Sequence, residues 1–149
     1  MRWSNVPVPE PQLVAIAAGA GMHLLLPIRA PFRGLFRWPL AASLMAGGLG
    51  LVAWAVASAG DADVERETAL VTHGAFAITR NPMYLGWSAG VLGLAVASRS
   101  AWMLAAWSGA VWVLDREIRA EESRLSDRFG ASYDAYRTRV PRYLRPPRP

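Results

Sequence analysis

The 149-residue sequence contains no cysteine, and all of its basic residues are arginine. The absence of cysteine excludes disulfides, thiolate nucleophiles, cysteine-ligated zinc and iron–sulfur clusters. The only histidines, His23 and His73, are isolated from each other in the sequence. The adjacent Glu121 and Glu122 would point about 100° apart on a helix. We therefore expect no metal site.

Charged residues are also scarce, at 18% of the chain against about 25% in typical soluble domains. Apolar residues make up 53% and fall in long blocks. This combination argues against a disordered chain and against a small soluble enzyme. We expect a single domain that is embedded in a membrane.

The sixteen arginines are unevenly placed, because nine of them lie between Arg116 and Arg148. A basic chain can bind nucleic acid. Here, however, the arginines directly follow an apolar block, which is typical of the cytoplasmic flank of a membrane helix. We expect a lipid bilayer and no nucleic acid as partner. The sequence does not indicate an oligomeric state.

Four apolar blocks predict about four transmembrane helices, at residues 13–26 (extendable to 11–28), 38–59, 83–98 and 101–114. The second block has 22 residues without a charge, which meets the roughly 20 residues that a bilayer requires. The third and fourth blocks are shorter, and whether they span fully is left open.

A signal peptide is the alternative interpretation of the first block, since Arg2 precedes it. Pro7 and Pro9 intervene, however, and no clear cleavage motif follows Pro27. We expect an anchor helix, in which His23 has a packing or interfacial role.

The connector between the third and fourth blocks is only Arg99-Ser100. Such a short turn makes the two helices an antiparallel hairpin. Beyond residue 114 the pattern stays helical until Phe129-Gly130, where we expect a stop. The predicted fold class is therefore an all-α, polytopic membrane protein with a cytoplasmic helical C-terminal extension.

An even number of spans places both termini and residues 61–82 on one side of the membrane. That side carries twelve arginines against four on the other, and all eleven acidic residues. By the positive-inside rule it is the cytoplasmic side, and we expect the cell inner membrane as the location.

The pentapeptide Gly86-Trp87-Ser88-Ala89-Gly90 matches the serine-hydrolase nucleophile motif. That chemistry requires a strand-to-helix elbow, whereas Ser88 falls inside an apolar helix. We interpret Gly86, Gly90 and Gly93, like Gly47, Gly48 and Gly50 in the second block, as helix-packing positions.

Two polar segments form a more specific pattern. The first is Leu70-Val71-Thr72-His73-Gly74-Ala75-Phe76 with Arg80-Asn81-Pro82-Met83-Tyr84-Leu85-Gly86; the second is Glu121-Glu122-x-x-Leu125, Phe129-Gly130-x-x-Tyr133-x-x-Tyr136 and Arg139-Val140-Pro141. In this order and spacing they resemble the isoprenylcysteine carboxyl methyltransferase and phospholipid methyltransferase superfamily of integral membrane enzymes.

The resemblance implies S-adenosylmethionine-dependent methyl transfer at the cytoplasmic face. It divides the domain into two anchor helices (residues 1–60) and a cofactor-binding part (residues 61–149). The residues that it implies as cofactor contacts are Thr68, Ala69, Leu70, Val71, Phe76, Asn81, Pro82, Met83, Tyr84 and Glu121. An aromatic face suits the sulfonium cation, and a carboxylate suits ribose hydroxyls or an ammonium group.

Arg80, Glu117 and Glu122 are the expected catalytic residues. Members specific for isoprenylcysteine carry a histidine at the position of Thr68 and an arginine at the position of Glu117. This chain is therefore expected to methylate an amine, a thiol or a lipid headgroup instead of a prenylcysteine carboxylate. An amine or thiol must lose a proton, which Glu117 or Glu122 could accept.

Two alternatives remain. Sterol reductases have a similar C-terminal half and use a nicotinamide cofactor, although their chains have many more spans. A non-catalytic membrane protein could also bind a partner or anionic lipid through its arginine-rich tail.

Overall fold

The computed structural model describes residues 10–60 and 69–144. Within these residues the chain forms helices and no strand. They are α1 (Glu10–Leu25), α2 (Arg37–Ala59), the short 3-10 helix η2 (Gly74–Ala77), α3 (Pro82–Ser98), α4 (Ala101–Phe129) and α5 (Ala131–Arg139). The all-α prediction is confirmed for this part of the chain.

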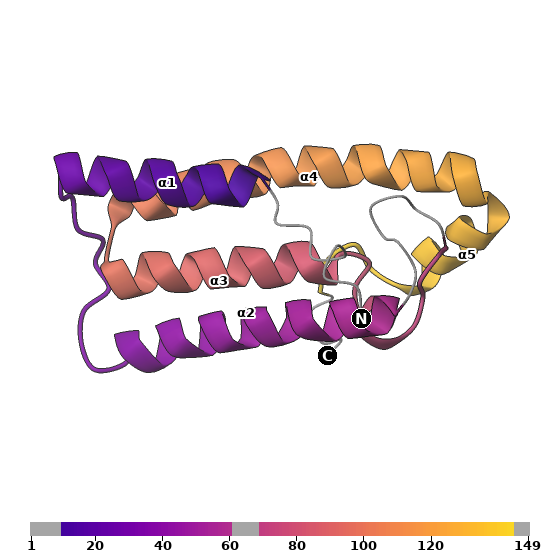
Figure 1. The fold of residues 1–149 in the computed structure, drawn as a ribbon, viewed down its shortest axis with the longest axis horizontal. Coiled ribbons are helices and arrows are strands. Elements are labelled where there is room, and N and C mark those ends of the chain that lie inside the picture. The colour runs from indigo at the N-terminus through magenta and orange to yellow at the C-terminus, as the bar shows by residue number, and fades with distance from the viewer. Residues whose placement is uncertain (1–9, 61–68, 145–149) are drawn as a thin grey trace.

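The helices lie nearly parallel to one long axis in two packed pairs, α2 against α3 and α1 against the first half of α4 (Figure 1). The predicted hairpin of α3 and α4 joins the two pairs. The second half of α4 extends beyond the other helices, and α5 turns back beside its end (Figure 1). The polar segments of the sequence gather at this end of the bundle.

Glycines bring α2 and α3 into close contact. A Cβ atom at Gly86 would lie 2.6 Å from the carbonyl oxygen of Gly48 and from Val52 Cγ2. A Cβ at Gly93 would lie 2.6 Å from Met45 Cγ. The packing role is confirmed for Gly48, Gly86 and Gly93. By contrast, a Cβ at Gly90, Gly47 or Gly50 would meet nothing within 4 Å.

At the opposite end, the turn between α3 and α4 pairs with the α1–α2 connector. Arg99 adopts a left-handed conformation (φ 55°) that ends α3. The Ser100 hydroxyl then caps α4 by accepting a hydrogen bond from the Met103 amide. The backbones of Arg29 and Ser100 form a bridge, which fixes the predicted two-residue connector against the first half of the chain.

The count of four transmembrane spans is not confirmed. Among the described helices, α2 alone is both long enough and apolar enough to cross a membrane. The 16 residues of α1 and 17 of α3 extend only about 24–26 Å, against a hydrocarbon core of ~30 Å. Large apolar side chains such as Leu24, Leu25 and Trp38 are nevertheless exposed along the bundle.

We expect Gly86→Ala to lower the melting temperature in detergent. The added methyl group would displace α3 from α2, and overpacking of this kind costs about 1–3 kcal/mol. Gly90→Ala, one turn further along the same helix, is the matched control. It should be neutral or stabilising, because its methyl group has space and alanine favours helix. Equal melting temperatures for the two variants would contradict the packing role of Gly86.

Candidate active site

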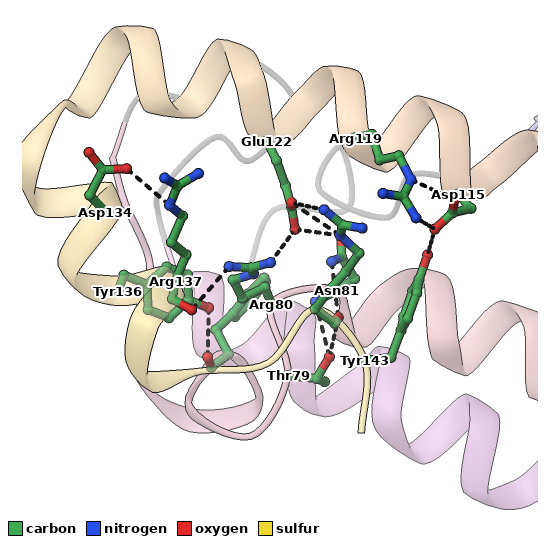
Figure 2. Close-up of polar contacts among 12 residues, drawn as sticks. Thr79, Arg80, Asn81, Asp115, Arg119, Glu122, Asp134, Tyr136, Arg137 and Tyr143 are labelled. Carbon is green, nitrogen blue, oxygen red and sulfur yellow. Dashed lines mark hydrogen bonds and ion pairs between the residues drawn. The ribbon is translucent and has the colours of Figure 1, made fainter. Parts of the chain in front are cut away.

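Three chain segments meet at the polar end of the bundle: residues 69–81, the second half of α4, and α5 with the residues that follow it (Figure 2). They are far apart in sequence and are joined by polar contacts and by an apolar cluster that includes Leu70, Leu125 and Val140. Each segment supplies side chains to one small cavity.

The first segment is fixed to α2 and α5 through η2. Gly74 has φ +60° and lies directly against Ser58, so that a Cβ there would collide with this side chain. The Ser58 hydroxyl accepts a hydrogen bond from the Ala75 amide at 3.1 Å. The Tyr136 hydroxyl donates to the Phe76 carbonyl at 2.7 Å. The aromatic ring of Phe76 is thereby held at the cavity.

The turn Thr79-Arg80-Asn81 holds the C-terminal segment. The Thr79 hydroxyl and the side-chain Nδ2 of Asn81 both donate to the Arg142 carbonyl, at 2.9 and 3.1 Å. The Arg80 amide donates to the Pro141 carbonyl at 3.0 Å. Pro82 then starts α3, at a first-turn position that suits a residue without an amide hydrogen.

Glu122 lies at the centre of the polar contacts (Figure 2). Its Oε1 is 2.8 Å from Arg80 Nη2, and its Oε2 is 2.6 Å from Arg142 Nη2. The side chains of Glu122 and Arg80 are only 13% and 10% exposed. One carboxylate on α4 therefore pairs with a guanidinium from each of the other two segments.

A cavity of about 60 Å³ adjoins this ion-pair cluster. It is lined by Ala69, Leu70, Val71, Phe76, Arg80, Asn81, Glu121, Glu122, Leu125, Tyr133 and Tyr136. Pockets that hold whole organic ligands usually measure about 300–1,000 Å³. The cavity has room for one functional group of a ligand, and a larger molecule would need the lining to move apart.

Many of the site residues expected from the sequence come together here. Ala69, Leu70, Val71, Phe76, Asn81 and Glu121 line the cavity, as do Arg80 and Glu122. Leu125, Tyr133 and Tyr136 also line it, although they were not among the candidates. The signal that could have identified them was their place in the second motif, two of them in Tyr133-x-x-Tyr136.

Four other candidates among the described residues, Pro82, Met83, Tyr84 and Glu117, lie away from the cavity lining. Pro82 and Met83 are buried in helix packing, with Met83 in a cluster that includes Val52 and Phe76. Tyr84 lines an adjacent apolar pocket of about 200 Å³, and its hydroxyl donates to Glu121 Oε2 at 3.2 Å. Thr68 lies outside the described residues. The side chains of Pro82 and Met83 are used in packing, and their contact with a cofactor stays a prediction.

Glu117, the fourth of these, is exposed and lines a different groove, between α1 and α4. This groove measures about 470 Å³ and includes Glu10. The two carboxylates expected in proton transfer, Glu117 and Glu122, therefore border different spaces.

Burial and nearby negative charge stabilise the protonated, neutral form of the tyrosines at this end of the bundle. Burial, followed by the negative charge of Glu122, raises the pKa of Tyr133 to about 12. Burial likewise raises the pKa of Tyr136. Burial and a hydrogen bond to Asp115 raise the pKa of Tyr143 to about 12.

We expect the folded protein to lose stability as the pH rises from 10 to 12. In this range the phenols of Tyr133 and Tyr143 have ionised in the unfolded chain and stay protonated in the folded one. The unfolded state then binds fewer protons, so stability falls with rising pH. Because the chain lacks lysine and cysteine, tyrosinate absorbance can be followed beside a denaturation curve without other side chains titrating near pH 10. A folded protein with most tyrosines ionised at pH 10 would contradict the assignment.

Glu122→Gln should destabilise the protein strongly, by about 3 kcal/mol or more, because it leaves two largely buried guanidinium groups without their counter-ion. Arg119→Gln is the control, since it breaks the exposed ion pair with Asp115 and should cost less than about 1 kcal/mol. Thermal or denaturant unfolding in detergent compares them. Similar stabilities for the two variants would contradict a central role for Glu122.

Comparison with known proteins assigns the chain to a family. No curated protein and no solved structure matches the chain. The phospholipid methyltransferase family matches residues 36–132, which include α2, η2, α3, α4 and the start of α5. The match covers well over half of the chain, with the whole of the first polar motif and the second motif from Glu121 to Gly130. The chain therefore belongs to the phospholipid methyltransferase family, within the group of integral membrane methyltransferases.

Proposed function

We propose that this membrane methyltransferase uses S-adenosylmethionine and that the cofactor binds at the cavity between residues 69–81, α4 and α5. The observation that carries the proposal is the convergence of Leu70, Val71, Phe76, Asn81 and Glu121 on one cavity. These residues were expected to contact the cofactor from sequence alone, and they come from separate parts of the chain.

The donors and acceptors at the cavity suit the cofactor. S-adenosylmethionine supplies a methyl group on a sulfonium cation, beside an ammonium, a carboxylate and a ribose. The ring of Phe76 offers an aromatic face to a cation. Glu121 offers a carboxylate for the ammonium group or a ribose hydroxyl. Tyr84 orients this carboxylate through its hydrogen bond of 3.2 Å.

Glu122 and Arg80 hold the site in shape. Both carboxylate oxygens of Glu122 already accept hydrogen bonds or ion pairs from guanidinium groups. A carboxylate held in this way is better suited to position Arg80 than to accept a proton from the acceptor. We therefore assign Glu122 and Arg80 to positioning, in place of the direct catalytic role expected for them.

The acceptor is an amine, a thiol or a lipid headgroup that approaches from the membrane. Methyl transfer requires alignment of the two reactants and exclusion of water. An amine or thiol acceptor must also lose a proton. Glu117 lies one helical turn before Glu121 on α4 and its charge acts on the Tyr84 hydroxyl, so we assign the proton to Glu117. We place the site at the cytoplasmic face of the inner membrane, where the positive-inside rule puts the arginine-rich half.

Calorimetry in detergent tests cofactor use. S-adenosylmethionine should bind saturably, and Glu121→Ala should lose most of the affinity because the carboxylate contact is removed. Asp127→Ala is the matched control, since this carboxylate is exposed on the same helix and does not line the cavity. NADPH serves as the second ligand. Binding of NADPH alone would favour a reductase, and binding of neither ligand by folded protein would overturn the proposal.

Glu117→Gln tests the proton acceptor separately. With an amine acceptor, the variant should keep its affinity for S-adenosylmethionine and transfer a labelled methyl group at least roughly 100-fold more slowly, the scale of general-base catalysis. The loss should be greatest at low pH, where the amine is protonated. Full transfer activity in this variant would remove Glu117 from the mechanism.

A further inference from the structure

Two buried hydrogen-bond donors at the cavity have no partner among the described residues. One is the hydroxyl of Tyr133, a residue that is only 1% exposed. The other is Nε of Arg80, whose side chain is 10% exposed. Both residues line the same cavity. Buried donors are almost always paired, so an unpaired one needs an explanation.

The polar groups next to the two unpaired donors all have hydrogen-bond partners in the protein. Tyr136, three residues after Tyr133, donates its hydroxyl to the Phe76 carbonyl at 2.7 Å. In Arg80, Nη2 pairs with Glu122 at 2.8 Å, and Nη1 donates to the Arg137 carbonyl at 3.3 Å. Nε is the one nitrogen of the Arg80 guanidinium that is left. The two free donors therefore belong to side chains that are otherwise fixed in place.

The chemistry of the two donors indicates what they bind. Arg80 and Arg142 share the carboxylate of Glu122, and Glu121 adds a second carboxylate to the cavity lining. Tyrosine O–H and arginine N–H groups both donate, so their common ligand must be an acceptor. The cavity of about 60 Å³ is large enough for a carboxylate group.

We propose that Tyr133 Oη and Arg80 Nε bind the carboxylate of the amino-acid end of S-adenosylmethionine. This inference rests on the proposed function and assigns one end of the cofactor to one side of the cavity. The carboxylate accepts both buried hydrogen bonds, and the one from the Arg80 guanidinium is charge-assisted. Tyr133 is then a positioning residue for the cofactor.

The test compares two ligands that differ in the carboxylate. S-adenosylhomocysteine carries it, and the corresponding decarboxylated thioether, S-adenosyl-3-thiopropylamine, lacks it. Tyr133→Phe should weaken S-adenosylhomocysteine roughly tenfold to a hundredfold, the scale of one hydrogen bond to a charged group. It should leave the affinity for the decarboxylated ligand within about twofold. Calorimetry in detergent gives both constants without turnover.

Tyr136→Phe is the matched control, because it removes a hydroxyl that has a protein partner. It should lower the melting temperature of the unliganded protein and change the two affinities by the same factor. The unliganded Tyr133→Phe protein should melt no lower than wild type, since it loses only an unpaired buried hydroxyl.

Three outcomes would overturn the inference. Tyr133→Phe could weaken both ligands equally or neither, which would place the carboxylate elsewhere while leaving cofactor binding intact. Unliganded Tyr133→Phe could melt lower than wild type, which would give the hydroxyl a structural role. If wild-type protein binds no S-adenosylhomocysteine at all, the inference and the proposed function both fail.

Discussion

The ion pairs of Glu122 are the interaction on which the polar end of this molecule depends. One carboxylate on α4 pairs with Arg80, which precedes α3, and with Arg142, which follows α5. The same two arginines also form backbone contacts with each other's segments, at Pro141 and Thr79. Because charge pairing and backbone hydrogen bonds join the same segments, the cavity walls hold one another in place. In the low-dielectric interior, a guanidinium without its counter-ion would destabilise the fold. The ion pairs of Glu122 with Arg80 and Arg142 must therefore form together.

The apolar bundle determines where this cluster can form. Close contact at Gly48 and Gly86 sets the separation of α2 and α3. The end of α2, with Ser58, and the start of α3, after Asn81, therefore lie at the same end of the bundle (Figure 1). The long α4 carries Glu121 and Glu122 past this point, and α5 brings its tyrosines back towards it. The apolar half of the protein thus acts as a scaffold for a small polar site at one end.

The sequence predicts the helices well where apolar runs and turn residues coincide. The observed α2 and α3 each begin one residue before the predicted blocks, and α4 ends at Phe129 as expected. The observed α1 begins one residue before the extended first block and three residues before its apolar part, because Glu10 and Gln12 are polar. Gln12 is nevertheless buried and donates a hydrogen bond to Ser88. The cavity lining was largely predictable, but only from a pattern of motifs taken together. The role of Arg142 was not, because one arginine in a basic tail looks like its neighbours until the chain folds back. The unpaired hydroxyl of Tyr133 likewise depends on tertiary contacts that no spacing rule encodes.

The central claim is that the cofactor binds among residues 69–81, α4 and α5. Hydrogen–deuterium exchange of the detergent-solubilised protein, with and without saturating S-adenosylhomocysteine, tests it most directly. The account predicts slower exchange in residues 69–81 and in the segment from Glu121 to the end of α5, with α1 and the first half of α2 unchanged. Protection confined to the groove between α1 and α4, or no change at all in protein saturated with ligand, would contradict it.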